Sequence, residues 1–442
     1  APEWRAALAR LQELAPLPYT PGDPFYNGFW TNPDTGATLA YQGISQDNYY
    51  LRQAIDRYNE ANGTSLRYEP VTDARRRMIE TKRSFEQEIT QYQFIAGLEG
   101  SFNDIDWDAY INQGYRSRQD VDLGQFSGAR LFNALGPSAD MNGDGVPECY
   151  TDITNPNTMI AGCVPLNMFG GGSVVRETGQ TVAATLTQDM IDYVSVDLVD
   201  TFSTKQSLAG GTVSGSLWDL PGGALGWAAG YSYWKQEYKY TPDSGKQSGA
   251  VTGNVGAGTD GSLVNNAVFA EVLAPVYDNG TQEVILKGGL RYDDYDAFDG
   301  DTTYQLGLEF QAIENLKLRG TYGTVFRAPG ISELYGGVVD SFPTAVDPCA
   351  QGEPLPPGCT GPGDQPDSQI RSAVGGNPNL IPETGDTLTA GVVWTPTFGD
   401  HGITATLDYW EIDLEDGISS LGVQYTLDAC YYDLDPAACA LI

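Results

Sequence analysis

The acidic stretch Asp140-Met-Asn-Gly-Asp-Gly-Val-Pro-Glu148 carries the residue types best suited to bind a metal ion. It follows the D-x-N-x-D-G spacing of calcium loops, in which alternate oxygen ligands converge on one cation and a glycine allows the sharp turn. The candidate ligands are Asp140, Asn142, Asp144 and Glu148. Thr151 stands where such loops place a bidentate glutamate, so the stretch also fits a plain turn. We therefore expect no required cofactor, with calcium as a candidate ligand.

The six cysteines form three pairs that are close in the sequence, each in a segment rich in Gly, Pro, Asn and Asp. Six cysteines allow fifteen pairings, and adjacency favours the local ones. The expected disulfides are Cys149–Cys163, Cys349–Cys359 and Cys430–Cys439. Free thiols or zinc ligands are the alternatives, but zinc is disfavoured because the chain has no C-x-x-C and a single histidine. Small disulfide loops indicate an oxidising compartment.

Arg327, in Phe326-Arg327-Ala328-Pro329, is a further candidate for chemistry. Pro329 removes a backbone donor and so ends a strand, which places the arginine at a strand end. A guanidinium there either binds a substrate or satisfies nearby carboxylates and a neighbouring strand. We favour the structural role.

No arrangement typical of an enzyme stands out. The sequence GTVSGS (211–216) lies within an expected strand rather than at the strand–turn–helix elbow of a serine nucleophile. His401 lies beside Asp400 in a hairpin turn, which is not the setting of a histidine-based triad. Acidic pairs such as Asp293 and Asp294 are expected by chance among 58 acidic residues. We predict that the protein is not an enzyme.

The elements that must position these residues are predicted to be long antiparallel strands. The segment 386–418 has two runs of alternating apolar and polar residues around a Pro-Thr-Phe-Gly-Asp-His-Gly turn, a period of two that strands require. In the second run Ile403, Ala405, Leu407 and Tyr409 point to one side, and Thr404, Thr406, Asp408 and Trp410 to the other. Five such hairpins are predicted: 86–100 with 104–117, 203–219 with 223–239, 264–276 with 282–296, 302–311 with 315–327, and 385–397 with 402–416.

The connections are sorted by length. Turns within the hairpins are short, whereas three of the connections between hairpins, 118–202, 240–263 and 328–384, are long. This asymmetry is typical of outer-membrane β-barrels, and a soluble sandwich has shorter strands. In 223–239 one face is apolar and ends in Tyr231 and Tyr233, which suits lipid and an interfacial girdle, while the other face is small. We expect an all-β fold, an antiparallel transmembrane β-barrel with long disulfide-stapled extracellular loops.

Composition and charge agree with this fold. The 442 residues include 53 Gly and 26 Tyr, and 58 acidic against 24 basic residues give a formal net charge of −34. This charge argues strongly against nucleic acid as a partner, because phosphate binding needs clustered Lys and Arg. No apolar run approaches the ~20 residues of a membrane-spanning helix, but a closed barrel satisfies every backbone group with strands alone.

Residues 1–85 differ from the rest. An amphipathic start from Trp4 to Leu14, which lacks the features of a signal peptide, precedes an aromatic stretch and a second expected helix, Ser45–Asn62. We predict an extracellular loop region with short helices over 1–85 and barrel hairpins over 86–442. Five basic residues close the first region: Arg75, Arg76, Arg77, Lys82 and Arg83. They are candidates for contact with an anion or with lipopolysaccharide, but we favour a solvated turn that leads into a strand.

Several segments together resemble the TonB-dependent outer-membrane receptors, particularly those with large loops. They are LKLRGTYGTVFRAPGISELYGG (316–337), GGNPNLIPETGDTLTAGVVWTP (375–396), LDYWEIDLEDGI (407–418), CVPLNMFGGG (163–172), LWDLPGGALGWAAGYSYWKQE (217–237) and YTLDACYYDLDPAACALI (425–442). The set covers most of 70–442 in the order that the family shows. The resemblance implies a Gram-negative outer membrane and extracellular loops.

The chain departs from the family in lacking a TonB box, a plug domain and the last strands. Ten strands are about half of the 22 of plugged transporters, and an open sheet edge is not viable in hydrocarbon. We therefore expect an internal portion of a longer or split receptor. The partners implied are TonB with ExbB and ExbD through a plug outside this portion, outer-membrane lipid and lipopolysaccharide, and an extracellular ligand.

The leading hypothesis is energised uptake of a scarce ligand captured by the loops. Phe25, Tyr26, Phe29 and Trp30 suit carbohydrate or peptide at least as well as an anionic metal chelate, which usually meets basic loops. A surface adhesin or interaction scaffold without transport is the alternative. A passive porin ranks last, because it needs an open lumen.

Overall fold

The computed structural model describes residues 29–31, 38–40, 43–71, 78, 80–81, 83–169, 185–252, 254–363, 365, 369–399 and 401–442, with the backbone alone for the first two ranges. Several sequence-based interpretations fall outside the described residues or side chains. They concern the start from Trp4 to Leu14, the side chains of Phe25, Tyr26, Phe29 and Trp30, the basic residues Arg75, Arg76, Arg77 and Lys82, and Asp400.

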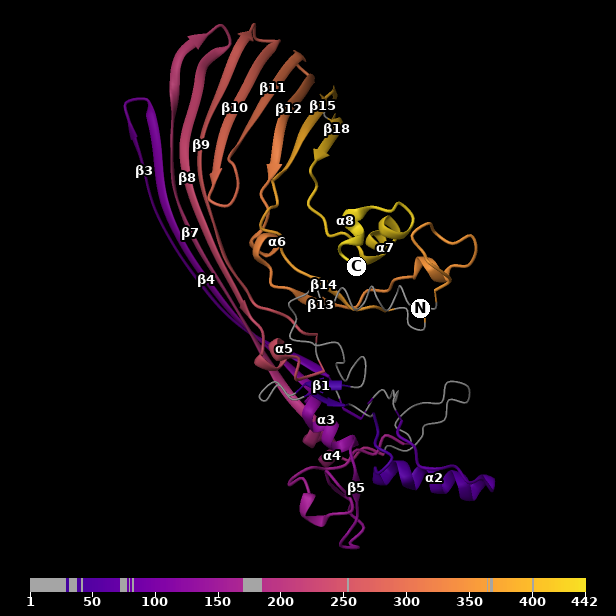
Figure 1. Ribbon diagram of the computed structural model, residues 1–442. Coiled ribbons are helices and arrows are strands. Elements are labelled where there is room, and N and C mark those ends of the chain that lie inside the picture. Colours follow the sequence, from indigo (N-terminus) through magenta and orange to yellow (C-terminus); the bar gives the residue numbers. More distant parts are fainter. Residues whose placement is uncertain are drawn as a thin grey trace.

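Ten antiparallel strands form one curved sheet (Figure 1) in the order β18-β15-β12-β11-β10-β9-β8-β7-β4-β3. Neighbours in the sheet are therefore neighbours in the sequence among the long strands, as in an up-and-down meander. The strands are β3 (Ser84–Phe102), β4 (Ile105–Phe126), β7 (Ser195–Leu220), β8 (Gly223–Thr241), β9 (Thr259–Asp278), β10 (Glu283–Tyr295), β11 (Asp301–Ile313), β12 (Leu316–Arg327), β15 (Glu383–Trp394) and β18 (Ala405–Glu415).

All five predicted hairpins are confirmed. Both strands of the first two are longer than predicted, whereas in the third β9 is longer and β10 is shorter than predicted. The fifth is corrected in its bounds: the strand expected over 385–397 ends at Trp394, and its partner expected over 402–416 begins at Ala405. Pro396 cannot donate to the ladder. A separate two-residue ladder of β16 (Thr397–Phe398) and β17 (His401–Gly402) fills the turn.

The register assigns each strand residue to one of two faces. On one face, here the apolar face, lie Trp227, Val272, Leu290, Leu306 and Leu308. On the other, the polar face, lie Lys287, Gly289, Gln305, Glu309, Lys317 and Arg319. Alternation of this kind is what a barrel strand between lipid and a polar interior requires.

The long connections, the segment before β3 and the segment after β18 carry small elements of their own. These are β1 (Phe29–Thr31), β2 (Thr38–Ala40), α2 (Tyr49–Asn62), α3 (Gly128–Leu135), β5 (Ser138–Ala139), β6 (Glu148–Cys149), η1 (Pro156–Thr158), α4 (Gln188–Val194), α5 (Ser244–Ser248), α6 (Ile331–Tyr335), β13 (Val339–Ser341), η2 (Pro348–Ala350), β14 (Ser372–Val374), α7 (Val423–Tyr431) and α8 (Pro436–Cys439). Among the described residues no helix is long and apolar enough to cross a membrane.

The helix predicted over Ser45–Asn62 is confirmed and begins four residues later, at Tyr49. Asn48 fixes this start as the N-cap, because its side chain accepts hydrogen bonds from the backbone amides of Tyr50 and Leu51. Gly63 ends it in the left-handed conformation that glycine adopts without strain.

Three small apolar cores organise the long connections. One joins α2, α3 and α4 through Leu51, Leu135 and Val194. A second joins Leu427 and Tyr431 of α7 to Ala345, Cys349 and Ile370. In the third, Ile331 and Leu334 of α6 pack with Leu263 and against Trp234, Tyr238 and Tyr295. Since the register places Trp234 and Tyr238 on the polar face, α6 covers that face, and Figure 1 shows the neighbouring β13 and β14 on the same side of the sheet.

Candidate functional site

Of the four predicted calcium ligands, Asp140, Asn142 and Asp144 lie in the turn between β5 and β6, and Glu148 is the first residue of β6. Asp140 accepts hydrogen bonds from the backbone amides of Gly143 (2.7 Å) and Gly145 (2.9 Å). Asn142 donates to Asp144 (3.0 Å) and to Glu148 (3.1 Å). Among the described residues no group of three or more His, Cys, Asp or Glu side chains is arranged to hold a metal ion. The loop satisfies its own polar groups, and calcium binding there stays a prediction.

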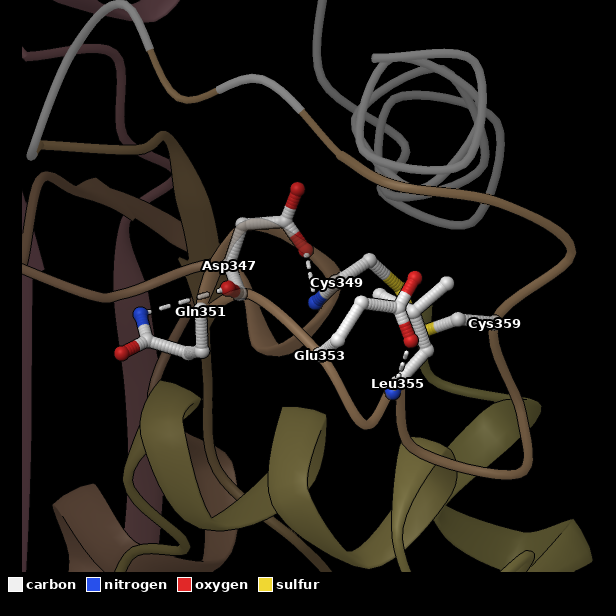
Figure 2. Close-up of a disulfide and its surroundings, with 6 residues drawn as sticks. All are labelled: Asp347, Cys349, Gln351, Glu353, Leu355 and Cys359. Atoms are coloured by element: carbon white, nitrogen blue, oxygen red, sulfur yellow. Dashed lines mark hydrogen bonds between the residues drawn. A yellow bond between two sulfur atoms is a disulfide. The ribbon is translucent and has the colours of Figure 1, made fainter.

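The three predicted disulfides, Cys149–Cys163, Cys349–Cys359 and Cys430–Cys439, are confirmed. The first closes the segment 149–163, which directly follows the acidic loop. The second lies in the loop of Figure 2, where Asp347 accepts a hydrogen bond from the backbone amide of Cys349 (2.9 Å).

The second and third disulfides belong to one packed unit. Cys349, Leu427 and Tyr431 share an apolar core, against which Cys359 and Cys430 pack. The amide of Gly358 donates to the carbonyl of Tyr431 (2.9 Å). Each of these two loops, which lie about seventy residues apart in the sequence, is closed by its own disulfide. The two loops also pack against each other.

Arg327 joins the ends of two strands to α6. Its guanidinium lies 3.1 Å from a carboxylate oxygen of Glu333 and 2.9 Å from one of Glu383. Glu383 also accepts a hydrogen bond from the amide of Ile418 (2.6 Å), and Glu333 from that of Gly330 (2.6 Å). Hydrogen bonds from Arg327 and Gly330 lower the pKa of Glu333. The predicted structural role of Arg327 is confirmed by these contacts.

A buried ion pair fixes the β13–β14 hairpin. Arg371 lies 2.8 Å from Asp340, and both side chains are almost fully buried. The amide of Asp340 donates to the carbonyl of Val255 (2.8 Å), and Asn254 donates to the carbonyl of Asp340 (3.1 Å). Burial raises the pKa of Asp340 against the opposing effect of Arg371. The hairpin is thereby attached to the loop before β9.

The central polar face carries charged residues that bridge strands. Glu309 pairs with Lys287 and with Lys317 (2.7 Å), across β10, β11 and β12. Arg319 pairs with Asp408 (2.8 Å) across β15, where Gly391 leaves room for the two side chains to meet. A groove of about 560 Å³ runs over small residues of this face, and a second of about 330 Å³ lies beside Phe269 and Arg291.

A charged and aromatic cluster lies where β4, β7 and β8 approach the long loops. Lys246 of α5 pairs with Asp122 (2.5 Å) and Asp200 (2.8 Å), and Tyr240 donates to Asp200 (3.2 Å). Tyr240 stacks on Phe202 at 4.5 Å between ring centroids. Burial disfavours the charged amine, but the hydrogen bonds to the two carboxylates outweigh it and raise the pKa of Lys246.

Next to this cluster is a small pocket of about 100 Å³ lined by Arg116, Arg118, Phe202, Thr204 and Tyr238. The guanidinium of Arg118 lies 3.8 Å from the centroid of the Phe202 ring and 3.1 Å from Asp120. The sequence-based interpretation missed these residues, because it placed most of them in a loop or treated them as plain strand. Their signal is the continued alternation of charge in Arg116-Ser-Arg-Gln-Asp-Val-Asp122.

Comparison with known proteins is consistent with the fold. A family model for the "TonB dependent receptor-like, beta-barrel" matches residues 23–437. The vitamin B12 transporter BtuB of Vibrio cholerae serotype O1 is 26% identical over 152 residues, which are 33% of this chain and 18% of that protein.

Two solved structures are similar in part. One is a mutant of the ferric enterobactin receptor PfeA of Pseudomonas aeruginosa, with a TM-score of 0.43 and 15% identity over 74% of this chain and 35% of that one. The other is the siderophore receptor PirA of Acinetobacter baumannii, with a TM-score of 0.40 and 12% identity over 75% and 35%. The chain thus spans less than a fifth of the curated relative and about a third of the two solved chains.

Proposed function

The chain belongs to the TonB-dependent receptor family, and on this premise we propose that it forms part of the barrel of an outer-membrane receptor that imports a scarce extracellular ligand. Members of this family are transport receptors, so the chain is part of a receptor and not an enzyme. TonB, with ExbB and ExbD, would supply the energy through a plug inside the barrel.

The observation that carries this proposal is the difference between the two faces of the sheet. The apolar face is suited to lipid. The polar face holds grooves and ion pairs, and α6 and its neighbours fold over it at the end with the long connections. A ligand arriving between these loops would meet the polar wall before it met any plug.

The orientation follows from the same sorting of connections. Outer-membrane barrels have short periplasmic turns and long extracellular loops. We place the disulfide-closed loops outside the cell, in the oxidising environment that disulfides need. Lipopolysaccharide would then surround the outward ends of the strands.

The ligand is a carbohydrate, a peptide or a metal chelate. Aromatic residues at the loop end of the polar face, among them Trp234 and Tyr240, offer stacking surfaces for any of these. Uptake by deletion and complementation tests the function directly. We expect cells that carry the full-length gene to accumulate a ligand that co-purifies from native membranes, and cells without TonB or without this gene to lose that accumulation.

A surface adhesin or interaction scaffold is the second candidate. The packed unit around Cys349–Cys359 and Cys430–Cys439 favours it, because a rigid disulfide-closed platform suits protein binding. Experiments in cells that lack TonB distinguish the two functions. Ligand accumulation that persists there contradicts energised uptake, whereas cell-surface binding of a protein that persists there supports the scaffold.

A further inference from the structure

The pocket beside Phe202 is built by side chains that the sheet register places on one face. In the strand register, Arg116 of β4 lies opposite Thr204 of β7, and Thr204 lies opposite Tyr238 of β8. Two residues further along the same face, Arg118 of β4 lies opposite Phe202 of β7. Two arginines thus line one pocket of about 100 Å³, in a chain with 58 acidic and 24 basic residues.

Arg116 differs from every other basic residue of the ten strands. Each of the others forms an ion pair with an Asp or Glu. Arg116 has no ion pair or hydrogen bond among the described residues, and it lines the pocket with its side chain exposed. In so acidic a chain, an arginine without a carboxylate is available for an anion from outside.

Arg118 supplies a second donor that is already oriented. Its guanidinium is held over the Phe202 ring and beside Asp120. Its Nε–H is buried and has no hydrogen-bond partner among the residues that the structure describes. A buried donor without an acceptor is costly, and an oxyanion in the pocket would satisfy it.

The pocket lies beyond the part of β4 that a membrane requires. β4 begins at Ile105, and about 9–11 residues suffice to cross the hydrocarbon. Arg116 comes after that length on the side of the long loops. An extracellular ligand would therefore reach it without crossing lipid.

The surrounding charge selects the kind of anion. Asp120, Asp122 and Asp200 lie beside the pocket and are opposed by Arg118 and Lys246, so these neighbours carry one net negative charge. With Arg116 added, the cluster is neutral. A monoanion binds with little repulsion, whereas a dianionic phosphate is opposed more strongly. Guanidinium groups also match the planar carboxylate geometry.

We propose that Arg116 and Arg118 form a subsite for a carboxylate group of the imported ligand. This subsite rests on the proposed receptor function and narrows the ligand to a carboxylate-bearing molecule. Thr204 and Tyr238 line the same pocket and carry hydroxyl groups that can donate hydrogen bonds to a carboxylate.

Trifluoroacetate is a suitable probe, since ¹⁹F NMR detects its binding to the purified full-length receptor in a neutral detergent. We expect saturable broadening of its resonance, displaced by acetate, and no broadening of the neutral trifluoroethanol. Arg116→Gln should weaken binding roughly tenfold, as expected for loss of one charge-assisted hydrogen-bonding group. The matched control Arg67→Gln, at another exposed arginine, should leave it unchanged.

A second measurement uses the wild-type protein alone, so that the test of the subsite does not depend on whether the variant folds. Phenylglyoxal should modify Arg116, as read by peptide mass, and trifluoroacetate should slow that modification. Equal binding by Arg116→Gln and wild type overturns the subsite, and so does modification that the probe leaves unaffected. Displacement by inorganic phosphate as effective as by acetate overturns the carboxylate assignment. Uptake that depends on TonB without carboxylate binding contradicts only this inference, whereas carboxylate binding without such uptake contradicts only the transport function.

Discussion

Glu333 makes the attachment of α6 dependent on pH. Arg327 and the amide of Gly330 lower its pKa from an ordinary value of 4.5. The folded carboxyl therefore has a lower pKa than the unfolded one, and its stabilising contribution is complete above about pH 4.5. The contribution is lost as the pH falls through the folded pKa. We expect proteolysis of the loop 328–382 in the full-length receptor to accelerate below pH 4.5.

Glu333→Gln provides the control for this effect. The variant should show faster proteolysis at pH 7 and a weaker dependence on pH, because its amide does not titrate in this range. Equal acceleration in acid for the variant and the wild type would assign the effect to other carboxyl groups.

The acidic turn between β5 and β6 gives a second prediction at the residue scale. If its oxygens rearrange around a cation, isothermal titration of the full-length receptor should detect calcium with a Kd of about 10⁻⁴–10⁻³ M, the range of extracellular calcium modules. Asp144→Ala removes one candidate ligand and should abolish the heat signal. Identical titrations for the two proteins would end the calcium hypothesis.

At the scale of elements, the β13–β14 hairpin depends on the pair of Arg371 and Asp340. Both side chains are at most 4% exposed, so removing the cation leaves a buried carboxylate without its counter-charge. Arg371→Met should destabilise the loop cap, by which we mean the β13–β14 ladder together with the loop before β9 to which it is attached. The expected loss is about 3–5 kcal/mol, as for other broken buried pairs. Amide hydrogen exchange of 338–341 and 369–374 measures the loss. Asp340→Asn combined with Arg371→Met should recover part of it, and no difference between the single and double variants would contradict this account.

The loop cap also needs close backbone contact at Gly337. A Cβ there would lie 2.3 Å from the carbonyl oxygen of Gly258 and 2.6 Å from that of Ala257, and neither atom is at the end of a movable side chain. Gly337→Ala should therefore cost about 1–3 kcal/mol through overpacking. Gly361→Ala is the matched control, because a Cβ there meets nothing within 4 Å. Limited proteolysis of the cap should distinguish the two, and equal rates would contradict the prediction.

Sequence patterns predicted the elements better than their extent or their contacts. The alternation of 386–418 and the adjacency of Cys349 and Cys359 are local signals. The first gave the correct strand pairing and the second the correct disulfide. β4 was expected to end at residue 117, although it continues to Phe126. Its last part keeps the alternation with charged rather than small inward residues, and this pattern looked like a loop.

The pocket could not be predicted for a different reason. Arg116 and Thr204 are 88 positions apart, and only the register of β4 with β7 brings them together. A shift of one residue would turn one of them to the opposite face. Sequence alone contains the two residue types but does not fix that register.

At the scale of the whole molecule, the strands are of two lengths, and this gives a test of orientation. β3, β4, β7, β8 and β9 have 19 to 26 residues, whereas β10, β11, β12, β15 and β18 have 11 to 13. Because about 9–11 residues cross the hydrocarbon, the longer strands form a wall that rises past the membrane. The wall carries the Arg116 pocket on its polar face, so the pocket is useful to a receptor only if the wall rises outside the cell.

Introduced cysteines can measure that orientation, since the six native cysteines are all in disulfides. A membrane-impermeant maleimide applied to intact cells should label Glu69→Cys, in an exposed segment beside α2, and should not label Thr281→Cys, in the short turn between β9 and β10. Ala229→Cys, on the apolar face of β8, should resist the reagent even in broken cells because lipid covers it. The reverse labelling of Glu69→Cys and Thr281→Cys would place the wall in the periplasm, where an extracellular carboxylate could reach Arg116 only after it had crossed the membrane. The receptor function and the carboxylate subsite therefore depend on the same orientation, and this experiment needs no knowledge of the ligand.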